Sequence, residues 1–186
     1  MSYGSVSPSP RWGEVWIIAR GPSVRQFDLS RLRNKQVLGV NTFVLCLETP
    51  AAICSADWRW IGSHRNLLGK YEGERYLAVS LETHPEAAGI PGAVYLQRSY
   101  DSGLSDDAGA LCLGGNSGYA AINLAVLKGA TDIHLVGFDM RPEDGEKFQQ
   151  WAPLFRSMRP QLARLGVRVT NHNPQSAIDA FPFGDA

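Results

Sequence analysis

Residues that could bind or transform a ligand stand at the ends of five of the seven predicted strands of this chain. They are Gly21, Asn41, Asp57, Asp139 and Asn171. In an open parallel sheet, ligands bind beyond the carboxyl ends of the strands, and all of these ends share one edge. Ordinary turn chemistry also places glycine and polar residues in such loops. The set as a whole therefore favours a ligand site more than any single member does.

The first of these loops reads Arg20-Gly21-Pro22-Ser23. Glycine lets a backbone approach a ligand closely, and the free N–H groups of a following helix favour an anion such as a phosphate. A helix end contributes only about 0.3–1 kcal/mol, so Arg20 would have to add a charge-assisted contact. The loop is neither a G-x-G-x-x-G nor a Walker pattern, which excludes the standard dinucleotide and P-loop sites. The alternative is a plain strand-to-helix turn.

A second glycine-rich loop, 114–118, leads into a strongly apolar helix predicted over 119–128. Its Asn116, Ser117 and Gly118 combine a flexible backbone with polar side chains, which suits a sugar or a phosphate. Alternatively, Asn116 or Ser117 caps the helix.

The candidates for acid–base chemistry are Asp57, His64 and His172. Asp57 and His64 fall on one side of a predicted helix, together with Trp60. A general base must lie within about 3 Å of the proton it removes, and either histidine is a candidate for that role. The alternative is that Trp60 packs into the core and His64 sits at the wet end of the helix. Asp139 could bind a ribose hydroxyl, hold a metal or cap a turn.

The composition restricts the class of protein. The chain has 186 residues, 44% of them hydrophobic and 19% charged, which is typical of one globular domain. Its formal net charge of +0 and the lack of a basic run argue against nucleic acid as a partner. We find no metal-type spacing and no membrane-length apolar stretch. The three cysteines, Cys46, Cys54 and Cys112, are expected to be buried thiols, and with no secretion signal we expect a cytoplasmic protein.

Strands and helices are predicted to alternate, which favours an α/β, Rossmann-like, open and mainly parallel sheet with helices on both faces. We expect a flexible lead at 1–10, a single nucleotide-binding domain over 11–186 and a mobile loop at 99–109. The expected strands are 14–20, 36–41, 51–55, 76–80, 93–97, 132–137 and 167–170. The expected helices start near Val24 with Ser23 as cap, run over 57–69, 119–128 and 148–165 (with Pro153 and Pro160 as interruptions), and end in a helical turn at 175–180.

Four segments together resemble a known family. They are IIARGPSV at 17–24, VNTF at 40–43, NSGYAA at 116–121 and ATDIHLVGFD at 130–139. This pattern is similar to that of the bacterial family 42 sialyltransferases and of a superfamily that includes hydroxymethylpterin pyrophosphokinases and many phage-borne proteins. The resemblance implies a CMP-type nucleotide-sugar donor. It implies that the donor is bound by Gly21, Pro22, Ser23, Asn41, Ser117 and Gly118, with Asn173 and Ser176 near the nucleotide.

The chain also departs from that family. Arg20 stands where the family has asparagine, and residues 140–160 contain neither tyrosine nor histidine, where the sialyltransferases place tyrosines and a catalytic histidine. Our leading hypothesis is a nucleotide-sugar-dependent glycosyltransferase. The alternatives are an ATP-dependent pyrophosphokinase, with Mg²⁺ held by Asp57 and Asp139, and a non-catalytic nucleotide-binding or interaction module. The five tryptophans also make a homo-oligomer a candidate arrangement.

Overall fold

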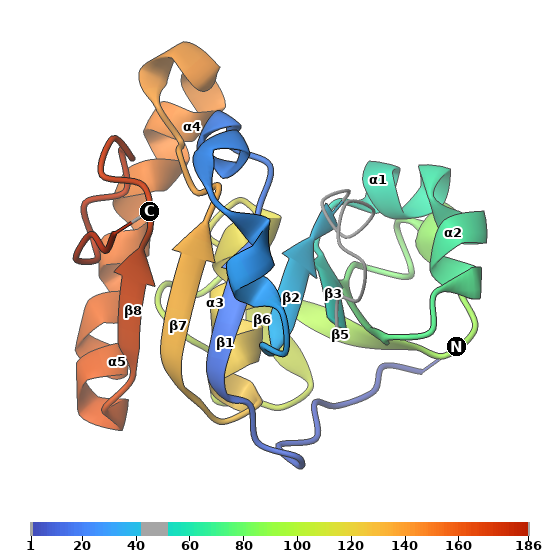
Figure 1. Cartoon of the computed structure of the whole chain (residues 1–186). Coiled ribbons are helices and arrows are strands. Elements are labelled where there is room, and N and C mark those ends of the chain that lie inside the picture. The colour runs from blue at the N-terminus through green and yellow to red at the C-terminus, as the bar shows by residue number, and fades with distance from the viewer. Residues whose placement is uncertain (1, 42–51, 186) are drawn as a thin grey trace.

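A single sheet of eight strands organises the chain, and all of its strand pairs are parallel. The computed structural model describes residues 2–41 and 52–185. The strand order is β6-β5-β4-β3-β2-β1-β7-β8, so the direction of winding reverses between β1 and β7 (Figure 1). This confirms the predicted open, Rossmann-like α/β fold. The strands are β1 (Gly13–Ile18), β2 (Val37–Val40), β3 (Ala52–Ser55), β4 (Glu74–Ala78), β5 (Ala93–Ser99), β6 (Ala110–Cys112), β7 (Ala130–Val136) and β8 (Arg168–Asn171).

Helices cover both faces of the sheet because side chains alternate along the strands. Ile17 and Cys54 point into one core, which packs against α3 and α5. Ile18 and Ile53 point the other way, towards the 3₁₀ helices that follow β1 and towards α1 and α2. The α-helices are α1 (Trp58–Ser63), α2 (Arg65–Lys70), α3 (Ser117–Leu127), α4 (Glu146–Trp151) and α5 (Arg159–Leu165).

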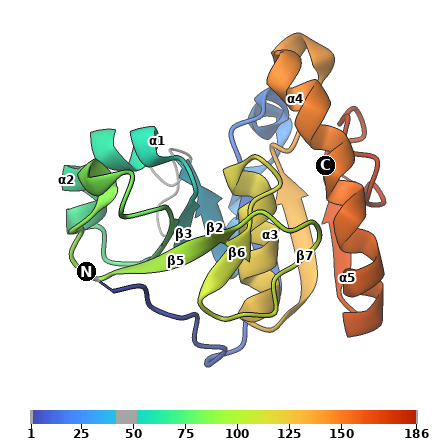
Figure 2. The same ribbon diagram turned by 180° about the vertical axis from the view of Figure 1, so that it is seen from behind.

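Helix α3 lies against the middle of the sheet (Figure 2). Nine of its 11 residues are buried, as expected of a helix that is apolar on all sides. It provides the crossover from β6 at one edge of the sheet to β7, beside β1. The start of α3 is therefore fixed above the carboxyl ends of the central strands.

Several predicted elements differ from the structure. The helix expected near Val24 is wrong: two 3₁₀ helices, Pro22–Gln26 and Leu29–Leu32, replace it. Ser23 does not cap a helix, because its hydroxyl donates to Asp139 instead. The helix expected over 57–69 divides at His64 into α1 and α2. Strand β6 was not expected, and at three residues it is too short to have a clear pattern.

The carboxyl-terminal third differs as well. The helix expected over 148–165 consists of α4, a 3₁₀ helix at Ala152–Met158 and then α5. Pro153 and Pro160 each stand in the first turn of the piece they begin, where a missing N–H costs little. No helical turn forms at 175–180, because the Ser176 hydroxyl binds the backbone of Phe138 instead.

Hydrogen bonds hold the predicted lead against β5 and the predicted loop against α3. Gly4 N–H donates to the Tyr95 carbonyl at 2.9 Å, and Tyr119 OH accepts from Gly103 N–H at 2.9 Å. The boundary at residue 10 and the mobility of the 99–109 loop stay predictions. Cys54 and Cys112 are buried free thiols, while Cys46 lies outside the described residues. Within residues 2–41 and 52–185, no helix has the length and apolar character needed to cross a bilayer.

Two histidines stack on Trp16 on the face of the sheet away from α3. The Trp16 ring centroid lies 4.3 Å from that of His134 and 4.9 Å from that of His172. His134 Nδ1 is 3.0 Å from His172 Nε2. Burial, and then the neighbouring His172, lower the pKa of His134, against the weaker opposing effect of Glu14 and Asp132. The folded chain therefore resists protonation of His134.

The first prediction concerns the stability of this cluster. Because the pKa of His134 is lower in the folded chain, the unfolded chain binds more protons once the pH falls below about 6.5. The free energy of unfolding should therefore decrease from pH 7.5 to pH 5.5, and the decrease should be smaller in His134→Gln. Urea unfolding of both proteins at the two pH values measures this. Equal decreases would show that His134 does not cause the pH dependence.

Candidate functional site

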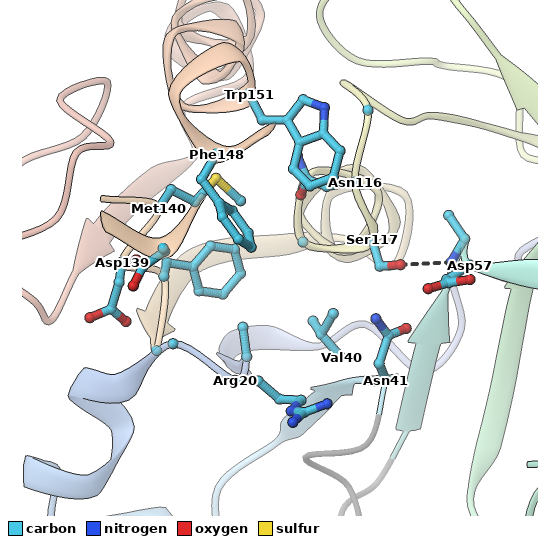
Figure 3. A pocket seen from close by; sticks show the side chains of 18 of the residues that line it. Arg20, Val40, Asn41, Asp57, Asn116, Ser117, Asp139, Met140, Phe148 and Trp151 are labelled. Atoms are coloured by element: carbon cyan, nitrogen blue, oxygen red, sulfur yellow. Dashed lines mark hydrogen bonds between the residues drawn. The ribbon is translucent and has the colours of Figure 1, made fainter. Parts of the chain in front are cut away.

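A cavity of about 640 Å³ opens at the carboxyl edge of the sheet. This size is typical of sites for small organic ligands. Its walls come from the loops after β1, β2, β3 and β7, from the start of α3 and from α4 (Figure 3). It lies at the reversal of strand order between β1 and β7, where open α/β sheets bind their ligands.

The turn after β1 is held against Asp139, which follows β7. The Asp139 carboxylate accepts from Ser23 N–H at 3.1 Å, from the Ser23 hydroxyl at 2.8 Å and from the Asn173 amide at 2.9 Å. Asp139 is only 3% exposed, so these hydrogen bonds replace the water that a buried carboxylate loses. A Cβ on Gly21 would lie 1.8 Å from Asp139 Oδ2, so only glycine fits there.

The amino-terminal end of α3 forms another wall. Asn116 caps the helix by accepting from Tyr119 N–H at 2.9 Å, and Ser117 Oγ accepts from Ala56 N–H at 2.9 Å. The first N–H groups of a helix have no acceptor within the helix. Those of Ser117 and Gly118 are therefore available at the positive end of the helix dipole, which favours an anion.

Two residues of the cavity wall hold unusual backbone conformations. Asn41 and Met140 have φ angles of 53° and 49°, in the left-handed region. Such conformations cost of order 1–3 kcal/mol and gather at functional sites. Asn41 Oδ1 is buried and has no hydrogen-bond partner within the described part of the chain. A ligand with an N–H or O–H donor would supply that partner.

Aromatic and basic side chains complete the cavity. Phe148 and Trp151 of α4 lie on the side facing Val40 and Asn41 (Figure 3), with their ring centroids 5.6 Å apart. Trp58 and Arg98 also line the wall. None of these four residues was among the site residues predicted from the sequence. The spacing of Phe148 and Trp151, three apart in a predicted helix, was the available signal for the α4 pair.

The structure brings most of the predicted site residues together. Three of the predicted residues do not line the cavity, namely Ser23, Asn173 and Ser176. They lie behind its wall and bind Asp139 or the backbone beside it. The predicted residues that line the cavity are Arg20, Gly21, Pro22, Asn41, Asp57, Asn116, Ser117, Gly118 and Asp139.

The two predicted histidines lie elsewhere. His64 stands between α1 and α2, stacked on Trp60 at 4.6 Å between ring centroids, with Nδ1 2.9 Å from the Trp60 carbonyl. His172 belongs to the Trp16 cluster. Neither lines the cavity.

Asp57 is the exposed carboxylate at the cavity wall beside Ser117 (Figure 3). Its Oδ1 caps α1 by accepting from Arg59 N–H at 3.0 Å and from Trp60 N–H at 3.2 Å. No hydrogen bond in the described part of the chain involves its Oδ2. Asp57 can therefore cap the helix and still accept a proton or a hydrogen bond from a ligand. Residues 2–41 and 52–185 contain no group of three or more His, Cys, Asp or Glu arranged to hold a metal ion.

No family model and no curated protein matches this sequence. Solved structures of the sialyltransferase CstII from Campylobacter jejuni do match its fold. The complex with cytidine-5'-monophosphate is 13% identical, covers 94% of this chain and 86% of that one, and has a TM-score of 0.59. The complex with the substrate analogue CMP-3FNeuAc is 14% identical, covers 92% and 84%, and has a TM-score of 0.55. At this identity, the likeness concerns the fold.

Proposed function

We propose that this protein is a nucleotide-sugar-dependent glycosyltransferase that binds a CMP-type donor in the cavity at the carboxyl edge of the sheet. The observation that carries the proposal is the convergence on one cavity of a helix amino terminus, the tightly packed turn after β1 and an unpaired Asn41 amide oxygen. The likeness of the fold to CstII, a sialyltransferase solved with cytidine-5'-monophosphate, supports the same reading.

The phosphate is assigned to the start of α3. The N–H groups of Ser117 and Gly118 point along the helix dipole, and Arg20 on the opposite side of the cavity adds a positive charge. The carboxylate of Asp139 packs against the turn after β1 and accepts hydrogen bonds from Ser23 and Asn173. We therefore assign Asp139 to positioning the turn, where the sequence left a ribose contact, a metal contact and turn capping open.

The nucleobase is assigned to the aromatic side of the cavity. Trp151 lines the cavity there, and stacking of a base on an aromatic side chain contributes about 1–3 kcal/mol. Asn41 Oδ1 lies on the opposite wall and would accept from an amino group or a ribose hydroxyl (Figure 3). These contacts fit a nucleoside of either base class, and the fold likeness favours cytidine.

The transfer itself requires one proton acceptor. The acceptor hydroxyl oxygen bonds to the anomeric carbon of the donor, and the bond from that carbon to the phosphate oxygen breaks. CMP leaves with the electron pair. We assign the hydroxyl proton to Asp57, because its Oδ2 is unoccupied and it lines the cavity, whereas His64 and His172 do not.

Calorimetry with CMP tests the binding site. We expect the wild-type protein to bind CMP without Mg²⁺, and Trp151→Ala to raise Kd about 5- to 150-fold through the lost stacking. Leu165→Ala is the control, because Leu165 is exposed at the end of α5 and lies outside the cavity. If the wild-type protein fails to bind CMP, the proposal is wrong. Binding of ATP only with Mg²⁺ would favour pyrophosphoryl transfer.

Asp57→Asn tests the role of the carboxylate. Asparagine caps helices as well as aspartate does, so the fold and its thermal midpoint should persist. We expect the rate of CMP release from a CMP-sugar to fall about 10²- to 10⁴-fold. Asp144→Asn, at another carboxylate of the cavity wall, is the matched control and should keep the wild-type rate. Wild-type turnover by Asp57→Asn would remove Asp57 from the mechanism.

A further inference from the structure

A second pocket, of about 270 Å³, adjoins the nucleotide cavity. The two share Arg98, Leu113 and Gly115, so they are neighbouring compartments of one cleft. The second pocket extends along the carboxyl end of β5 and the loop that follows it, away from β1 and β7. A transfer reaction needs two substrates side by side, and this arrangement provides a place for the second one.

Arg98 stands at the junction of the two pockets without a carboxylate partner. No ion pair in residues 2–41 and 52–185 involves Arg98, and its Nε is buried with no hydrogen-bond acceptor. The guanidinium instead lies 5.6 Å from the ring centroid of Tyr100. An unsatisfied buried donor costs free energy, and a ligand oxyanion would recover it. Arginine binds carboxylates and phosphates through paired hydrogen bonds.

The rest of the second pocket suits a ligand with hydroxyl groups and an apolar face. Tyr100 is 84% exposed, and Leu154 is 43% exposed, so both offer apolar surface at the rim. Ser102 adds a hydroxyl group, and Asp101 adds an acceptor for a ligand O–H. A sugar combines these properties, since it carries hydroxyls around its ring and C–H groups on its faces.

We propose that the second pocket binds the acceptor substrate, and that this acceptor is a sugar carrying a carboxylate or a phosphate that Arg98 binds. The inference rests on the proposed function, which supplies the donor in the neighbouring cavity. Arg98 then fixes the acceptor at the junction, with its reacting hydroxyl turned towards the donor. The positive charge of Arg98 does not prevent a neutral sugar from binding. It gives an anionic sugar the larger binding energy.

Binding of small sugars to the CMP-saturated protein tests the proposal. The probes are glucuronate, glucose 6-phosphate and glucose. The binding of each probe is measured by titration with saturation-transfer NMR. We expect the wild-type protein to bind at least one of the two anionic sugars at least tenfold more tightly than glucose. Preference for glucuronate or for glucose 6-phosphate identifies the carboxylate or the phosphate as the group recognised. Equal binding of all three sugars, or of none, would overturn the proposal.

Three variants locate the effect. Arg98→Gln should weaken binding of the preferred anionic sugar by at least tenfold more than it weakens binding of CMP. Ser102 lines the second pocket and not the nucleotide cavity. Ser102→Trp should therefore block binding of the sugar and keep the wild-type Kd for CMP. Arg164→Gln is the control, because Arg164 is exposed on α5 outside both pockets.

The outcomes separate this inference from the proposed function. If Arg98→Gln weakens CMP and the sugar equally, Arg98 belongs to the nucleotide site and the acceptor assignment is wrong. If the sugar binds through Arg98 to a wild-type protein that does not bind CMP, the proposed function fails and the pocket is not an acceptor site. If CMP binds as proposed but Ser102→Trp leaves sugar binding unchanged, only the present inference fails.

Discussion

The buried carboxylate of Asp139 holds together three segments that are far apart in the sequence. It follows β7 directly, and it binds Ser23 in the turn after β1 and Asn173 in the segment after β8. A buried charge with no hydrogen bonds would be very costly, so the three segments are constrained to meet at this point. The close approach of Gly21 to the same carboxylate shapes the wall of the cavity. The position of the cavity between β1 and β7 depends on this arrangement.

The cavity combines this fixed edge with groups that could bind a ligand. The start of α3 offers free N–H groups, Asn41 offers an unpaired oxygen, and α4 offers aromatic rings. Helix capping occupies only one of the two Asp57 oxygens, which leaves the other available to a ligand. The residues 140–160, which differ from the sialyltransferase pattern by lacking tyrosine and histidine, instead bring Phe148 and Trp151 to the cavity.

Much of the fold and part of the site follow from the sequence. Short apolar runs with polar residues after them predicted a parallel sheet and a ligand edge, because all parallel strands end at the same side. Asn41, Asp57 and Asp139, which line the cavity, were singled out in this way, and Ser117 was singled out by the glycine-rich loop before an apolar helix. The two histidines predicted for acid–base chemistry do not line the cavity, because His64 packs on Trp60 and His172 packs on Trp16. Local spacing in the sequence does not contain these contacts.

Other features depend on contacts that no local pattern contains. Ser23 could have capped a helix, but the distant Asp139 binds it and the segment becomes a 3₁₀ helix. Arg98 follows the strand expected at 93–97 and has no special pattern in the sequence, and only the sheet order places it between two pockets. The supporting role of Asn173 behind Asp139 likewise requires β8 to lie beside β7.

The affinity of Gly21→Ala for CMP tests most directly whether the packed turn at Asp139 forms a nucleotide site. A Cβ at Gly21 would lie 1.8 Å from Asp139 Oδ2 and 2.4 Å from the Gly137 carbonyl, so the turn must move. A Cβ at Gly62, within α1, meets Glu86 Cγ at an ordinary 3.5 Å, which makes Gly62→Ala the matched control. We expect calorimetry to give a Kd for CMP at least tenfold higher in Gly21→Ala and unchanged in Gly62→Ala. Wild-type affinity in a folded Gly21→Ala protein would contradict the account.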